Sequence, residues 1–296
     1  RRVGDCEIAL DDALGAARRA REDRRVNAVL AGAPLAALWG PNPVPRAGGR
    51  CLDVVRLLRI TTDSPAVEAT STRCQSVLEA FRGRAAAARR MIDSARRTVT
   101  ELGLRHALLE VEQFAGIVEL VVDETAAAEP HLRKAYNGFR RMGLDADTAE
   151  TAALLGRTCL ALGRIVEADE LCSESERLAG HALKPSIAWR TLRAQLLSRG
   201  HDHDQARRAY AEALRRASTW QCWSNLSALA LGLKDFDAAL ANARKAIGMA
   251  RDGAIEAPAA TVQQESGGAR GCAAARSASS SRASTCSRAP PRRRTS

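Results

Sequence analysis

The chain has 296 residues, of which 46% are hydrophobic, 27% are charged and only 3% are aromatic. This composition supports a core of aliphatic side chains, which favours close-packed helices over a β-sandwich and excludes a globally disordered chain. No run approaches about 18 uninterrupted apolar residues, so the sequence predicts no membrane-spanning helix. The formal net charge is +11, but seven of these charges are arginines within residues 267–296, which leaves +4 for the first 266 residues. The basicity therefore lies at the end of the chain rather than on a folded nucleic-acid-binding face.

One layout repeats along most of the chain, in which an apolar helical run ends at a turn and a second run follows. A small residue lies five positions after each turn residue. The turn residues and these small residues are Gly83 with Ala88, Asp123 with Ala128, Gly163 with Ala168, His201 with Ala206, and Lys234 with Ala239. Ala47 marks an earlier, degraded unit, and the six alanines are spaced by 41, 40, 40, 38 and 33 residues. Two helices of about 15 residues with two short turns fill this length, so we expect about six helix pairs within residues 1–252.

The residue types at these positions have physical roles. Glycine adopts the left-handed conformation that ends a helix, and Asp, His or Lys replaces it there less favourably. A small residue near the start of the second helix lets its partner approach closely, where a leucine would wedge the pair apart. One pair cannot cover its own apolar side, so successive pairs stack on a shared core. We therefore predict an all-α fold, a right-handed α-superhelix (solenoid) of tetratricopeptide-like helix pairs with lengthened helices.

The end of the chain has a different composition. Residues 267–296 are rich in Ala, Ser, Gly and Arg and contain no large aliphatic side chain. Such a segment cannot bury enough surface to offset its ordering entropy, so we predict a low-complexity, disordered tail over residues 253–296. A nucleic-acid or membrane-surface arm is one interpretation. We prefer the other one, that these residues are not native coding sequence.

The cysteines are widely spaced and form no Cys-x-x-Cys motif, which argues against a disulfide framework or a zinc site. Their positions are Cys6, Cys51, Cys74, Cys159, Cys172, Cys222, Cys272 and Cys286. We expect reduced, structural thiols in a cytoplasmic protein. The opening residues do not form a signal peptide and the first methionine is Met91, so we expect the chain to be a piece of a longer protein.

The most ligand-like cluster is His201-Asp202-His203-Asp204. A His-x-His pair with flanking carboxylates is able to hold a divalent metal, but the spacing places no third or fourth ligand from elsewhere. Asp and His are also good turn residues, and Asp204 is placed to cap the following helix. We therefore interpret the cluster as a helix–helix turn and predict no metal site.

The spacing of the other polar and aromatic residues indicates no catalytic site. His106, His131 and His181 stand singly, with no nucleophile or substrate group placed by spacing. Glu167 with Glu170 and Glu174 with Glu176 are interpreted as solvated helix faces near arginines. Arg89-Arg90 and Arg96-Arg97 are interpreted as exposed ion-pairing residues without the interleaved aromatics of a single-strand binder. Trp39, Trp189, Trp220 and Trp223 either line a ligand pocket on the concave surface or fill seams between repeats, and for Trp189 we expect core packing with Leu192 and Leu196.

Several segments resemble a known family. They are residues 39–44, Arg50-Cys51, Leu57-Leu58, and residues 114–120, 161–168, 174–176 and 189–194. Over roughly residues 8–250 they resemble the tetratricopeptide-like region of large actinobacterial proteins that join a class III adenylate/guanylate cyclase domain to a P-loop ATPase module. The region is also similar to the helical arm of large ATP-binding LuxR-type regulators. The chain contains no Gly-x-x-x-x-Gly-Lys-[Ser/Thr] motif and no recognisable cyclase metal-binding carboxylates. The resemblance therefore implies the arm of such a regulator without its catalytic parts.

These observations predict a non-catalytic scaffold that binds a protein or peptide partner in its concave groove. We expect no catalytic, cofactor-binding or metal-binding residues and no cofactor, and the sequence does not identify the partner-binding residues or the oligomeric state. The alternative is a transcriptional regulator arm that contacts DNA through the basic tail, although the charge distribution disfavours nucleic acid as a partner. A helical toroid enzyme is a third, weaker interpretation.

Overall fold

The computed structural model describes residues 3–39, 42, 44–61, 64–216, 227, 230 and 235–251. The chain divides into two compact units, residues 1–257 and 258–296, and every described residue belongs to the first. The predicted tail, residues 253–296, lies outside the described residues and stays a prediction.

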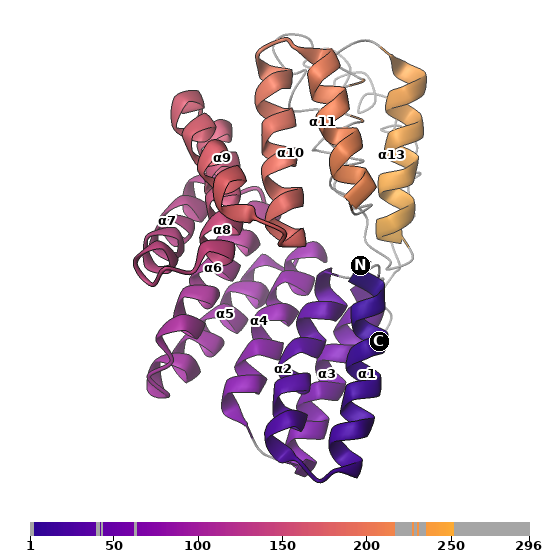
Figure 1. The fold of residues 1–296 in the computed structure, drawn as a ribbon, viewed down its shortest axis with the longest axis vertical. Helices are drawn as coiled ribbons and strands as arrows, with labels where there is room; N and C mark the ends of the chain where they lie inside the picture. The colour runs from indigo at the N-terminus through magenta and orange to yellow at the C-terminus, as the bar shows by residue number, and fades with distance from the viewer. Residues whose placement is uncertain are drawn as a thin grey trace, which may run out of the picture. The chain divides into compact units, whose positions relative to one another are not determined.

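All regular elements among the described residues are α-helices (Figure 1). They are α1 (Val3–Arg19), α2 (Asp23–Trp39), α3 (Val44–Thr61), α4 (Pro65–Phe81), α5 (Ala85–Glu101), α6 (Arg105–Val121), α7 (Thr125–Arg141), α8 (Asp145–Ala161), α9 (Ile165–Ala179), α10 (Leu183–Arg199), α11 (His203–Arg216) and α13 (Phe236–Arg251). None of the helices in this part of the chain has the length and apolar character needed to cross a bilayer.

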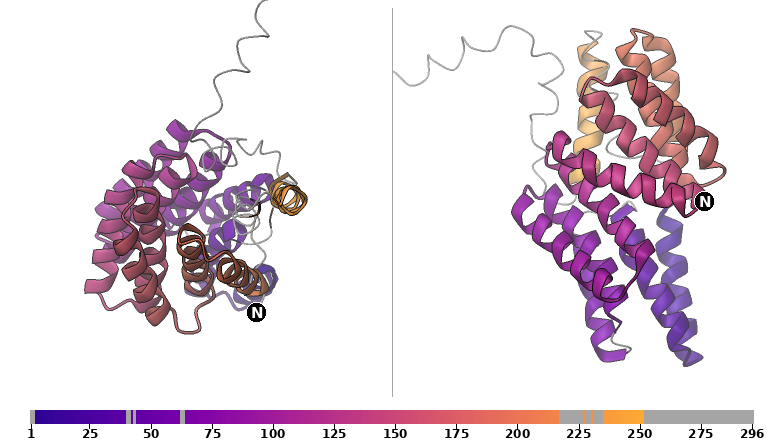
Figure 2. Two further views of the ribbon diagram at one scale, coloured as in Figure 1. Left: turned by 90° about the horizontal axis from the view of Figure 1, so that it is seen from above. Right: turned by 90° about the vertical axis from the view of Figure 1, so that its left-hand side faces the viewer.

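Consecutive helices pack as hairpins. The most extensive packing joins α8 to α9, α4 to α5, α6 to α7 and α10 to α11 (Figure 2). Helix α2 packs on both α1 and α3, and by its place in the order of helices we pair it with α3. We call α2, α4, α6, α8 and α10 the first helices and their partners the second helices. First helices also contact first helices of neighbouring pairs, as α2 does α4 and α8 does α10. Because each pair packs mainly on its sequence neighbours, the all-α solenoid of helix pairs is confirmed.

The helices are longer than those of a 34-residue tetratricopeptide repeat, as predicted. Each helix from α4 to α8 has 17 residues. Helices α4 to α9 begin at residues 65, 85, 105, 125, 145 and 165, so the helix pairs recur every 40 residues.

The same turn ends most of these helices. After α8, the Gly163 N–H donates to the carbonyl of Leu160 and the Arg164 N–H donates to that of Cys159, at 3.1 and 2.8 Å. This is a Schellman cap, and its central residue has a positive φ. The left-handed residues at such turns are Arg21, Gly83, Gly103, Asp123, Gly143, Gly163 and His201. Asp123 and His201 thus replace glycine as predicted, whereas Lys234 lies outside the described residues.

All six marker alanines are buried. Ala88, Ala128, Ala168 and Ala206 are fully buried, Ala47 is 1% exposed and Ala239 is 7% exposed. In the pairs α6–α7 and α8–α9, the marker alanine lies opposite a glycine of the partner helix. A Cβ on Gly116 would lie 3.3 Å from the Ala128 carbonyl oxygen, and one on Gly156 would lie 3.3 Å from that of Ala168. Small residues on both sides therefore set the separation of the paired helices.

The described cysteines lie in this packing. Cys51, Cys74, Cys159 and Cys172 are free and buried. Burial raises the pKa of the Cys51 and Cys172 thiols to about 12 and that of Cys159 to about 11. Such thiols are neutral and unreactive, so the structural interpretation is confirmed for these four. The side chains of Cys6, Cys222, Cys272 and Cys286 lie outside the described part.

Candidate partner-binding face

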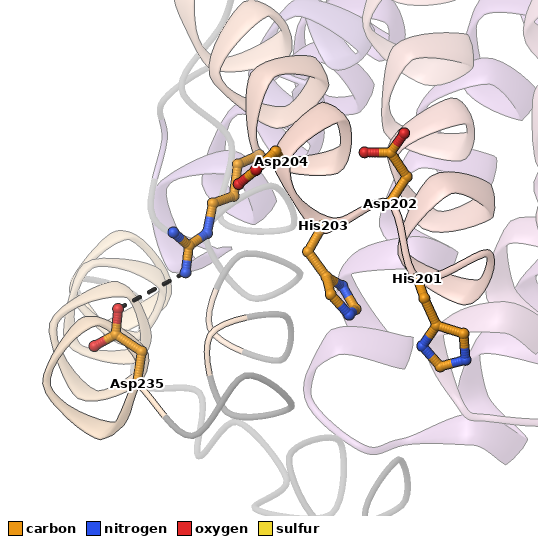
Figure 3. A pocket seen from close by; sticks show the side chains of 6 residues that line it. His201, Asp202, His203, Asp204 and Asp235 are labelled. Atoms are coloured by element: carbon orange, nitrogen blue, oxygen red, sulfur yellow. Dashed lines mark ion pairs between the residues drawn. The ribbon is translucent and has the colours of Figure 1, made fainter.

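The polar turn between α10 and α11 forms a helix cap (Figure 3). Asp202 Oδ1 accepts the Gln205 backbone N–H at 3.1 Å, and Asp202 Oδ2 accepts from Gln205 Nε2 at 2.5 Å. Asp202 is therefore the N-cap of α11, and the prediction that Asp204 caps this helix is wrong. The reason is that α11 begins at His203, two residues earlier than a cap at Asp204 requires, so that Asp204 already lies in its first turn.

The same turn does not gather metal ligands. The His201 and His203 rings lie with centroids 5.8 Å apart, and Asp202 points away from both imidazoles (Figure 3). Asp235, which lines the same cavity of about 400 Å³, pairs with Arg207 at 3.8 Å. Within the described part of the chain no three His, Cys, Asp or Glu side chains are grouped to hold a metal ion.

A second set of polar and aromatic side chains lies on the first helices. Arg73 of α4 pairs with Glu110 of α6, with Nη1 and Oε2 2.6 Å apart, and its guanidinium lies 5.1 Å from the centroid of the Phe114 ring. Trp39, the last residue of α2, meets Phe114 edge to face with centroids 6.2 Å apart. Arg73 and Phe114 are each only 3% exposed, so this part of the cluster is closed to solvent.

Lys184, near the start of α10, completes the set. Its Nζ lies 2.8 Å from Glu150 Oε1 on α8 and 4.9 Å from the centroid of the Trp39 ring. Five first helices thus meet in one cluster, which joins residues 145 positions apart in the chain. We call Trp39, Arg73, Glu110, Phe114, Glu150 and Lys184 the first-helix face.

Weaker polar contacts extend this face along α6 and α8. His106 lies between Glu110 and Asp147, with N–O distances of 3.6 and 3.4 Å. Gln113 Nε2 donates to Thr151 Oγ1 at 3.0 Å. His106 is therefore an exposed bridge between two carboxylates rather than a general base beside a nucleophile.

On the opposite flank of α6, Glu112 is buried between α5 and α7. Its carboxylate, 2% exposed, contacts Arg96 Nε at 3.1 Å, His131 Nδ1 at 2.7 Å and Lys134 Nζ at 2.9 Å. Although burial opposes ionisation, the hydrogen bonds from His131 and Lys134 and the charge of Arg96 lower the pKa of Glu112 to about 2. Arg89 pairs with buried Glu119 in the same seam, which also contains a cavity of about 210 Å³. Arg89 and Arg96 therefore have ion-pairing roles, as predicted, but their carboxylate partners are buried rather than exposed.

Three of the four acids predicted on α9, Glu167, Glu174 and Glu176, are ion-paired, and Glu170 is exposed. Glu167 contacts Arg133 at 2.7 Å and Arg164 at 3.4 Å, and Glu176 contacts Arg193 at 3.6 Å. Glu174 accepts a short hydrogen bond from the Tyr136 hydroxyl, which together with burial raises the pKa of Tyr136 to about 12. Glu170 and Glu176 are exposed and fit the predicted solvated helix face, whereas Glu174 is only 18% exposed and lies in the contact with Tyr136.

The tryptophans differ from one another. Trp39 belongs to the first-helix face. Trp189 is half-buried with the Arg190 guanidinium 4.1 Å above its ring, whereas Leu192 is fully buried. The predicted core packing is therefore achieved by Leu192 and only in part by Trp189. Trp220 and Trp223 lie outside the described residues.

Sequence reasoning missed Arg73, Glu110, Glu112, Glu150 and Lys184. The sequence contains a signal for Glu112 and another for Glu110 and Glu150. Glu112-Gln113 interrupts an otherwise apolar run from 111 to 118, which indicates buried polar partners. Glu110 and Glu150 are 40 residues apart, the period of the repeat. No local signal indicates Lys184, because its contacts come from helices distant in sequence.

Comparisons with known proteins add little to this geometry. No family model matches the chain, and no curated protein matches it. Among solved structures, it is similar to a chain in the crystal structure of the APC/C hetero-tetramer Cut9-Hcn1, with 14% sequence identity and a TM-score of 0.40. The match covers 80% of this chain and 48% of that chain, so our chain spans about half of its length. The fold assignment above rests on the helix arrangement itself.

Proposed function

We propose that this chain is a non-catalytic scaffold that binds another protein or a peptide along its first-helix face. The observation that supports this best is the convergence of polar and aromatic side chains from α2, α4, α6, α8 and α10 on one face. Stacked helix pairs use such faces to recognise extended or helical segments. The four buried free thiols support a reducing compartment, so we place this function in the cytoplasm.

Site-specific photo-crosslinking tests this proposal. Benzoylphenylalanine at His106 or Asp147, both about half-exposed beside the first-helix face, is expected to form adducts with one discrete partner in a lysate of the source organism. The matched positions are Asp93 and Asp169 on second helices, which are 55% and 56% exposed. Adducts of equal yield from all four positions, or from the second helices alone, would contradict the proposal.

The resemblance supports a more specific role, as the sensory arm of a cyclase–ATPase signalling protein. In that role partner binding biases the activity of catalytic domains that lie elsewhere in a longer chain, and residues 1–252 form the repeat domain. We expect the purified chain to form no cyclic nucleotide and to hydrolyse no ATP. Cyclase activity from the isolated chain would overturn the non-enzyme assignment.

A second candidate is the arm of a LuxR-type regulator that contacts DNA through its basic tail. The seven arginines of residues 267–296 favour it. A salt-titrated DNA-binding assay compares the full chain with one that ends at residue 252. Binding that is lost on shortening supports this candidate, and no binding by either chain removes it.

A further inference from the structure

We infer that Lys184 occupies a recognition site for a cationic side chain, and that a lysine or arginine of the partner takes its place. The site consists of the Trp39 ring face and the Glu150 carboxylate, and Phe114 contacts Trp39 edge to face. This inference rests on the proposed function, because it specifies the chemistry of the partner.

The two recognition groups suit a cation. An ammonium or guanidinium group is attracted to the face of an indole ring, and a carboxylate supplies charge-assisted hydrogen bonds. Lys184 Nζ uses both, at 4.9 Å from the ring centroid and at 2.8 and 3.0 Å from the two Glu150 oxygens. The lysine in the structure thus shows how a partner's cation would be held.

The two groups that hold the cation are packed against the rest of the protein, whereas the lysine that they hold is half-exposed. Glu150 is only 14% exposed and Trp39 packs against the hydrophobic core, whereas the Lys184 side chain is 42% exposed. A half-exposed lysine gains little from an ion pair, because screening and lost side-chain freedom offset the attraction. Lys184 is therefore easily displaced, while the carboxylate left behind requires another cation.

An unsatisfied donor lies at the same place. The indole Nε1 of Trp39 is buried, and no acceptor for it is found among the residues that the structure describes. A buried N–H without a partner is unfavourable, but this atom is closed to solvent, so an arriving segment does not reach it unless the Trp39 ring moves. The Trp39 ring face and the Glu150 carboxylate are therefore the groups that contact the partner's cation.

Charge on the neighbouring first helices favours the same partner. Besides Glu150, the carboxylates of Glu110 and Asp147 lie along the face, at 25% and 40% exposure. Arg73 already neutralises Glu110. An acidic segment would meet these carboxylates, whereas a basic one would add favourable contacts.

The test vacates the site and offers a small cation to it. Lys184→Ala is titrated with n-butylammonium chloride, and the Trp39 indole N–H signal is followed by NMR after its assignment with Trp39→Phe. We expect a saturable shift in Lys184→Ala and a response at least tenfold weaker in the wild-type chain, where Lys184 competes. Lys184→Met serves if the alanine variant does not fold, and n-butanol is the uncharged probe.

Two variants test specificity. Glu150→Gln with Lys184→Ala should abolish the butylammonium response, because the carboxylate is gone. Lys134→Ala removes a lysine that pairs with Glu112 without an aromatic ring, and should leave the Trp39 signal as in the wild type. Tetralysine should shift the Trp39 signal of Lys184→Ala more strongly than that of the wild type, and tetraglutamate should shift neither.

The inference is overturned if butylammonium leaves the Trp39 N–H signal unchanged in both Lys184 variants, or if the signal shifts equally when Glu150→Gln is added. The proposed function still holds in either case if crosslinks form at His106 and Asp147, and the partner then has another chemistry. Conversely, a cation response without such crosslinks removes the proposed function, and with it the partner's role, and leaves only a site at Trp39 and Glu150 that binds a cation.

Discussion

Helices α6 and α8 occupy the same place in successive helix pairs, yet their outer flanks differ. A shift of 40 residues aligns Gly116 with Gly156, and both glycines contact a marker alanine of their partner helix. The same shift aligns Glu112 with Ala152, which is fully buried and apolar. The repeat therefore preserves the separation of the backbones but not the chemistry of the seam.

The charges of the two seams come from different helices. At α6 the buried carboxylates belong to the first helix itself, and α5 and α7 supply the cations. At α8 the equivalent of Glu119 is Cys159, and the ion pairs join Arg133 and Arg164 to Glu129 and Glu167 around it. Close packing of glycine on alanine is thus the common requirement, while either a carboxylate or a thiol is tolerated beside it.

The largest effect should come from filling the close contact that both pairs share. A Cβ on Gly156 would lie 2.5 Å from Leu192 Cδ2, and one on Gly116 would lie 2.4 Å from Leu132 Cγ. Gly156→Ala and Gly116→Ala should therefore each lower the free energy of unfolding, by about 3 kcal/mol. Urea denaturation followed by circular dichroism measures this.

Gly49→Ala is the matched control for these substitutions. Gly49 is also helical, in α3, but a Cβ there would meet no atom within 4 Å. The alanine should stabilise the helix by about 0.5–1 kcal/mol through its higher helix propensity. Equal destabilisation at all three glycines would refute the close-contact explanation.

These glycines also show what the sequence could and could not predict. Helix pairs, their length and the buried alanines follow from local periodicity and residue size, which each repeat carries in its own sequence. Gly116 and Gly156 carry the same 40-residue spacing and were accessible to the same reasoning. By contrast, the contact between Trp39 and Lys184 depends on how five first helices stack, and no local pattern encodes it.

The next effect concerns the carboxylate that α6 has and α8 lacks. Glu112→Gln removes the charge that faces Arg96, His131 and Lys134, and should destabilise the chain by about 2 kcal/mol at neutral pH. The cost stays below that of a fully buried pair because the three partner side chains are 28–57% exposed and regain hydration. Thermal unfolding measures it. Ala152→Ser, at the equivalent position of α8, should cost less, and the reverse order would contradict the role of charge.

The destabilisation caused by Glu112→Gln should depend on pH. The folded-state pKa of Glu112, about 2, is below its ordinary value of 4.5, so its contribution is present above pH 4.5 and is lost as the pH falls toward 2. The difference in unfolding free energy between the wild type and Glu112→Gln should therefore shrink over this range. Denaturation series at pH 6, 4.5 and 3 measure it. A difference that is constant with pH would mean that Glu112 contributes through packing alone.

The smallest effect distinguishes the turns that follow the two helices. Both turns hold a left-handed residue, Asp123 with φ of 65° after α6 and Gly163 with φ of 79° after α8. Asp123→Gly should stabilise the chain by about 0.5–1 kcal/mol, because glycine has no Cβ to oppose this conformation, and Gly163→Asp should destabilise it by a similar amount. Urea denaturation of the two single variants and of the exchange variant measures both. Both turns keep the longer cap hydrogen bond, from the Glu124 N–H to the Glu119 carbonyl and from the Arg164 N–H to the Cys159 carbonyl, at 2.8 Å each. The two effects should therefore cancel in the exchange variant, and a net change would show that the turns are not equivalent.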